Sequence, residues 1–109
     1  MTELSGDEIR QRDELDFRRV LEAEINGLQA LAATLDSEFA DAVSAIEAIK
    51  TAGRTGRLII AGIGKSGHVA RKLAATFAST GTPAFFVHPA EASHGDLGMV
   101  APDDVVLVL

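Results

Sequence analysis

Four ionisable side chains stand within nine residues, directly after a short apolar run that ends at Val87. They are His88, Glu91, His94 and Asp96. Imidazoles and carboxylates at this spacing can move protons, contact a polar ligand or bind a metal ion. A single surface histidine is usually only solvated, and without the helical HExxH spacing the set is a loose zinc pattern. We interpret the cluster as one side of a ligand site.

A glycine-rich loop, Gly62-Ile63-Gly64-Lys65-Ser66-Gly67, is the second candidate. It follows an apolar run and opens a helical pattern, and its G-x-G-x-x-G spacing is typical of loops whose backbone N–H groups hold an anion. The alternative is a tight turn without a ligand. Lys65 disfavours that alternative, because a cation at the positive end of a helix dipole is stabilised by a negative ligand. We expect an anion site.

Two nucleotide-binding interpretations fit this loop less well. A dinucleotide fold places an acid about 20 residues further on, at the end of the next strand. His88-Pro89 stands there instead, and the nearest acid, Glu91, lies beyond the proline. A Walker A loop ending in Gly64-Lys65-Ser66 requires a glycine where the sequence has Ile59. The sequence therefore disfavours a nicotinamide or flavin site and excludes a P-loop.

Helical periodicity dominates residues 1–52, the expected region of N-terminal helices. Apolar residues recur every three or four positions from Asp13, after a polar lead-in that we expect to fray. Asp36 or Ser37 caps a second helix, which Gly53 ends in the left-handed conformation, and together the helices predict a hairpin. The apolar positions of the first helix are Phe17, Leu21, Ile25, Leu28, Ala32 and Leu35.

Residues 53–109 alternate apolar runs with one helical stretch. In that stretch Val69, Leu73 and Phe77 align at four-residue spacing. Strands joined through a helix imply a parallel sheet and an α/β fold, and the loops after the strands then face one crevice. We expect strands at residues 57–61, 84–87 and 105–109, the middle one followed by a loop, and a helix at 66–79 ended by Gly81 and Pro83.

Composition excludes several classes of function. The net charge is −6, with 12 acids and five bases in the first 50 residues against four acids and five bases in the rest. Such a chain binds nucleic acid or an anionic membrane poorly, although its second half can hold a phosphate. Without cysteine there is no disulfide and no thiolate nucleophile. The charged N-terminus is no signal peptide and no apolar run has membrane-spanning length, so we expect a cytoplasmic protein.

The segment from Gly62 to Val100 resembles the beginning of a sugar isomerase (SIS) domain. GKSGH, FASTGTP and the HP-E--HGDLGM run resemble, more closely, the bacterial D-arabinose 5-phosphate isomerases, which supply arabinose 5-phosphate for the Kdo sugar of lipopolysaccharide or capsule. The resemblance implies a three-layer α/β/α, flavodoxin-like domain, of which residues 53–109 are the first half. Because the sequence stops inside an apolar strand, we expect a fragment of a larger domain, inactive alone, or a sheet completed by a partner.

The resemblance also implies site residues and a reaction. It implies aldose–ketose isomerisation through an enediol, with Lys65 catalytically relevant, no required cofactor, and a dispensable zinc ion at His88. In the family, the later acid–base groups and a serine-rich phosphate turn lie beyond this sequence. The resemblance also implies a homotetramer of the full-length protein. A phosphosugar-sensing SIS module without catalysis is the alternative. The implied pentose-phosphate contacts are Gly64, Ser66, Gly81, Thr82, His88 and His94.

Overall fold

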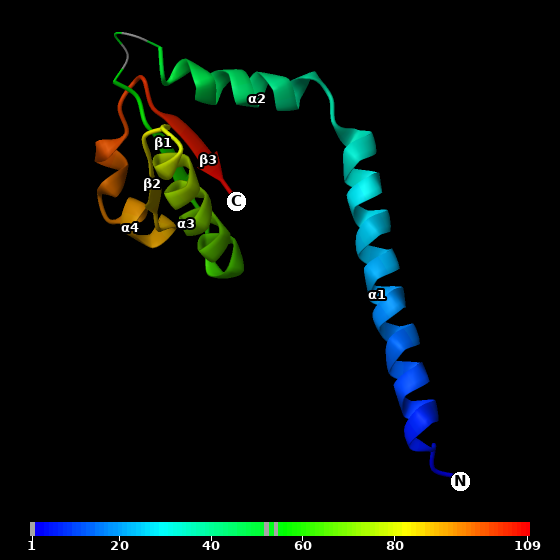
Figure 1. Ribbon diagram of the computed structural model, residues 1–109. Coiled ribbons are helices and arrows are strands. Elements are labelled where there is room, and N and C mark those ends of the chain that lie inside the picture. The colour runs from blue at the N-terminus through cyan, green and yellow to red at the C-terminus, as the bar shows by residue number, and fades with distance from the viewer. Residues whose placement is uncertain (1, 52, 54) are drawn as a thin grey trace. The chain divides into compact units, whose positions relative to one another are not determined.

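A computed structural model describes residues 2–51, 53 and 55–109 (Figure 1). The chain divides into two compact units, residues 1–38 and 39–109, which are taken in turn. The expected boundary between helices and α/β region falls at residue 52, outside the described residues, and stays a prediction. Where the structure describes the chain, no helix is both long and apolar enough to cross a membrane.

The first unit is helix α1, Gly6–Thr34. It begins seven residues before the expected start at Asp13, so the frayed lead-in was wrong. The reason is a capping box: the Glu8 amide donates to Ser5 Oγ at 3.2 Å, and the Ser5 amide donates to the Glu8 carboxylate at 2.7 Å. The Ser5 amide, as a donor to the charged carboxylate, also lowers the pKa of Glu8.

Helix α1 buries none of its residues, so its apolar side chains, Phe17 and Leu21 among them, remain exposed within this unit. Helix α2, Ser37–Ala48, lies almost wholly in the second unit, and the hairpin of the two helices stays a prediction. Asp36 caps α2 as expected, because its Oδ1 accepts the Glu38 amide at 2.9 Å. The helix ends before Gly53, whose φ of 87° is nevertheless left-handed.

The second unit is built on a parallel three-stranded sheet in the order β2-β1-β3, which confirms the α/β class. The strands are β1, Leu58–Ala61, β2, Ala84–Val87, and β3, Val105–Val108. Leu58 pairs with Ala84 on one side and Val105 on the other. As predicted from its apolar run, central β1 is buried on both faces, with Ile60 wholly enclosed. The carboxyl ends of all three strands therefore lie at the same end of the sheet.

Helix α3, Gly64–Ser79, lies along β1 and β2 and begins two residues earlier than predicted (Figure 1). Its buried face carries Ala70 and Ala74, whose small side chains let the helix approach Leu58 and Ile60 closely. Val69, expected on this face, is 54 % exposed. Of the three implied layers, the described residues thus show the sheet and the helical layer over one face.

The segment after β2 is more ordered than the predicted loop. It contains a short helix, α4, Pro89–Ser93, and a 3-10 turn, η1, Asp96–Met99, which contact each other. Pro89 favours this start, because a proline at the first helical position has the required φ and needs no hydrogen bond there. The ionisable cluster is therefore held on two short helical turns.

Candidate functional site

A cavity of about 200 Å³ opens at the carboxyl ends of β1 and β2. It joins the glycine loop after β1 to the first residue after β2, so the expected common crevice is confirmed for these two segments. No carboxylate lines it among the described residues. Its lining residues are Gly62, Gly64, Gly67, His68, Arg71, Phe86 and His88.

Two glycines make the loop tight enough to form this cavity. A Cβ on Gly67 would lie 2.8 Å from the Gly62 carbonyl oxygen, and one on Gly62 would lie 2.9 Å from the Ser66 carbonyl. Gly64 has a φ of 59°, a left-handed conformation that favours glycine. Backbone therefore replaces side chains along one wall, which leaves amide groups open to an anion.

His88 has a fixed ring orientation between β2 and α4. Its Nδ1 accepts the Ala90 amide at 3.1 Å, which caps α4, and its ring lies edge-on to Phe86 with centroids 6.4 Å apart. Because Nδ1 uses its lone pair for this bond, the proton of the neutral ring is on Nε2. His88 can thus donate a hydrogen bond to an oxygen of a ligand.

The hydrogen bond from the Ala90 amide to His88 Nδ1 also affects whether His88 can bind the expected zinc ion. In this tautomer Nε2 has no free lone pair for a metal, and Nδ1 already accepts a hydrogen bond. Within the described part of the chain, no group of three or more histidine, cysteine, aspartate or glutamate side chains could hold a metal ion. The present arrangement of His88 does not fit zinc.

Of the predicted site residues, Gly64 and His88 line the cavity. Lys65 and Ser66 follow Gly64 in the first turn of α3, both exposed and neither among the lining residues. His94 is the exposed C-terminal cap of α4, where its amide donates to the Glu91 carbonyl at 3.0 Å. The roles of these side chains stay predictions.

Gly81 and Thr82 lie at the opposite end of the sheet, where the strands begin. They precede β2, beside Pro83, whose carbonyl accepts the amide of Leu58 at the amino end of β1 at 2.7 Å. Thr82 is only 3 % exposed, and its amide donates to the Phe77 carbonyl at 2.9 Å. The structure therefore separates this pair from the cavity by the length of β2, and their predicted contact with the ligand is untested.

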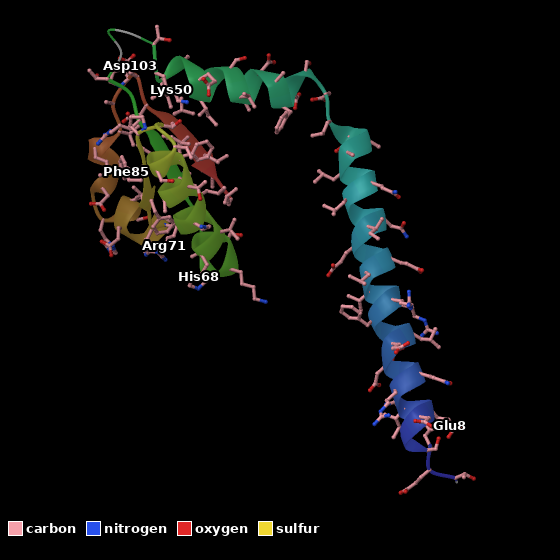
Figure 2. All side chains as sticks on the ribbon, in the orientation of Figure 1. Glu8, Lys50, His68, Arg71, Phe85 and Asp103 are labelled. Carbon is pink, nitrogen blue, oxygen red and sulfur yellow. The ribbon has the colours of Figure 1, made fainter. Side chains whose placement is uncertain are left out.

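Sequence reasoning gave no site role to three lining residues, His68, Arg71 and Phe86, the first two of which Figure 2 labels on α3. The signal was present: Gly64, Gly67, His68 and Arg71 recur at three- and four-residue spacing and so share one helix face. The guanidinium of Arg71 lies 4.2 Å from the centre of the Phe86 ring. Cation and ring together form a side wall of the cavity.

A second arginine–phenylalanine contact occurs away from the cavity. The Arg57 guanidinium lies 4.8 Å from the Phe85 ring centre and pairs with Asp104 at 3.2 Å. Asp104 Oδ2 also accepts the Ala101 amide at 2.7 Å, and its Oδ1 accepts the Arg57 amide at 2.8 Å. The Ala101 amide first, and then the Arg57 side chain, lower the pKa of Asp104. This arrangement ties β1 to the start of β3.

The fold and this glycine-lined cavity agree with what comparison with known proteins finds. The SIS domain family matches residues 54–109, and the chain belongs to that family. It is 50 % identical over 99 residues to the arabinose 5-phosphate isomerase KdsD of Pseudomonas aeruginosa, covering 87 % of this chain and 29 % of that protein. It is 51 % identical over 92 residues to KdsD of Yersinia pestis, covering 84 % and 26 %.

A solved structure from Escherichia coli CFT073, determined in complex with arabinose 5-phosphate, superposes with a TM-score of 0.72 at 40 % identity. The match covers 96 % of this chain and 51 % of that one. The chain thus spans less than a third of the length of the curated relatives named above.

Proposed function

We propose that the protein carrying this chain interconverts D-arabinose 5-phosphate and D-ribulose 5-phosphate, for the synthesis of Kdo in lipopolysaccharide or capsule. The observation that carries the proposal is the meeting of the glycine loop and His88 at one cavity, in a chain half identical to proteins named for this reaction. The proposal includes the cytoplasmic location and the homotetramer expected from the sequence.

The cavity supplies part of the necessary chemistry. Isomerisation removes a proton next to the carbonyl and places negative charge on the enediolate oxygens, which nearby donors stabilise. Open backbone amides at the glycine loop and Nε2–H of His88 are such donors. No carboxylate lines the described cavity, and the family resemblance places the base on a group beyond this sequence.

Turnover by the intact gene product is the test. Purified protein is mixed with arabinose 5-phosphate, and ribulose 5-phosphate is followed by NMR, alongside titration calorimetry with the same sugar. We expect both binding and conversion. Binding without conversion would favour the phosphosugar-sensing module, and binding of NAD in place of the sugar would contradict both interpretations.

Lys65 has a separate test within this proposal. If it acts on the reacting carbonyl, Lys65→Met lowers kcat by about a hundredfold, in the range of one lost acid–base or charge-stabilising group. Lys72→Met removes the same charge from an exposed position of α3 outside the cavity lining and serves as the matched control. Equal activity of the two variants would remove Lys65 from the catalytic groups.

A further inference from the structure

Arg71 is a cation that the fold holds at the cavity without neutralising it. Its guanidinium stacks on Phe86, 4.2 Å from the ring centre, and both residues line the cavity. Among the described residues no carboxylate pairs with it. From Gly62 to Gly81 the sequence contains no aspartate or glutamate at all. Arg71 therefore keeps its charge and its hydrogen-bond donors for another partner.

Arg57 makes a similar contact with a phenylalanine ring, but its other partners differ from those of Arg71. Arg57 also lies over a phenylalanine, but its side chain is held by the Asp104 carboxylate and by the Met99 carbonyl at 2.9 Å. Arg57 is not among the residues that line the glycine-loop cavity. Of these two arginines, Arg71 is the one without a carboxylate partner among the described residues.

We propose that Arg71, whose guanidinium lies over the ring of Phe86, binds an anionic oxygen of the sugar-phosphate ligand at the wall of the glycine-lined cavity. The proposal rests on the proposed function for the identity of the ligand. A planar guanidinium with five donors matches a phosphate or an enediolate through paired hydrogen bonds, and contact with the ring restricts where the guanidinium can lie before the ligand binds. The anionic oxygen belongs either to the phosphate group or to the enediolate formed during the reaction.

The substitution Arg71→Met in the intact protein distinguishes the phosphate group from the enediolate as the anion that Arg71 binds. If Arg71 binds the phosphate, the variant binds inorganic phosphate and arabinose 5-phosphate about tenfold or more weakly in calorimetry, as expected for the loss of a charge-assisted hydrogen bond. If it binds the enediolate, both affinities stay unchanged and kcat falls by a similar factor. Arg71→Lys, which keeps the charge but not the fork of donors, gives an intermediate loss.

Lys72→Met is the matched control, since Lys72 is the neighbouring cation on α3 and does not line the cavity. We expect it to change affinity and kcat less than twofold. Thermal unfolding of every variant shows whether the fold is retained, and Arg71→Lys decides the question if Arg71→Met does not fold. Unchanged affinity and kcat in a folded Arg71 variant, or equal losses in Lys72→Met, would overturn the proposal.

Failure of the proposed function is distinguishable from failure of this inference. If the wild-type protein converts no arabinose 5-phosphate, the isomerase proposal fails, and inorganic phosphate alone then tests Arg71. Weaker phosphate binding by the Arg71 variants would retain the inference as an anion site, and unchanged phosphate binding would reject it.

Discussion

On each face of strand β2 an arginine guanidinium lies over a phenylalanine ring, and the two contacts have different surroundings. Phe85 and Phe86 are successive residues, so their side chains point to opposite faces of the sheet. Over Phe85, Arg57 is paired with Asp104, whose side chain is fully enclosed. Over Phe86, Arg71 lines the cavity with no described carboxylate beside it.

The presence or absence of a neighbouring carboxylate distinguishes the two contacts: the Arg57 contact is structural, whereas we assign ligand binding to Arg71. The Asp104 carboxylate pairs with the Arg57 guanidinium and accepts hydrogen bonds from two backbone amides. These bonds join the start of β1 to the segment before β3. Arg71 has no carboxylate partner among the described residues, and it lines the cavity together with the backbone of the glycine loop. The same pair of residue types therefore has a different role on each face, which the surrounding carboxylates decide.

We expect the largest effect from a substitution at Gly67 in the glycine loop, because it should disrupt the cavity beside Arg71 and leave the Arg57 contact intact. In Gly67→Ala the new Cβ would meet the Gly62 carbonyl oxygen at 2.8 Å, which displaces the glycine loop and lowers the free energy of unfolding by about 2 kcal/mol. Phosphate binding at the cavity should be lost, as calorimetry would show. Gly98→Ala, with no heavy atom within 4 Å of the new Cβ, is the control and should bind normally. Normal binding by Gly67→Ala would mean that the loop does not form the site.

Substitution of the two rings gives a smaller and more selective effect. Phe86→Leu removes the surface on which Arg71 lies, and we expect affinity for arabinose 5-phosphate to fall by about two- to fivefold, as for the loss of an exposed cation–π contact. Phe85→Leu makes the same change over Arg57 and should leave affinity unchanged. Equal losses in both variants would show that the two faces do not differ in function.

Asp104→Asn acts on the structural face and should leave ligand affinity unaltered. Because the folded state lowers the pKa of Asp104, its carboxylate stabilises the fold above the ordinary aspartate pKa, and this contribution disappears as the pH falls through the lowered value. Wild-type protein should therefore lose stability below about pH 4, where the variant, already less stable, changes less. Thermal unfolding between neutral and acid pH measures the difference, and parallel pH curves would contradict it.

Much of the fold could be predicted from local signals. The apolar runs around Ile60 and Phe86 and the glycines between them are sufficient for a parallel sheet with a helix between its strands. The start of α1 was also readable, because Ser5 and Glu8 have capping-box spacing, but apolar periodicity becomes clear only further along. The helical turns after β2 are harder to predict, because each is only four or five residues long and shows no apolar periodicity.

The site was less predictable because it depends on direction and distance. Gly81 and Thr82 look close to His88 along the sequence, yet helix α3 returns the chain to the amino end of the sheet before β2 begins. Arg71 was overlooked because it lies outside the glycine motif, although it shares a helix face with Gly67 and His68. A charged side chain also does not reveal from sequence whether a distant carboxylate, as Asp104 does for Arg57, will neutralise it.

The central claim is that this cavity belongs to a pentose-phosphate isomerase, and isomerisation in deuterated water tests it most directly. The intact protein is incubated with arabinose 5-phosphate in D2O and the products are followed by NMR. An enediol mechanism predicts ribulose 5-phosphate with deuterium at the carbon that receives the solvent proton. Protein that binds the sugar phosphate but yields neither product nor exchange would contradict the claim.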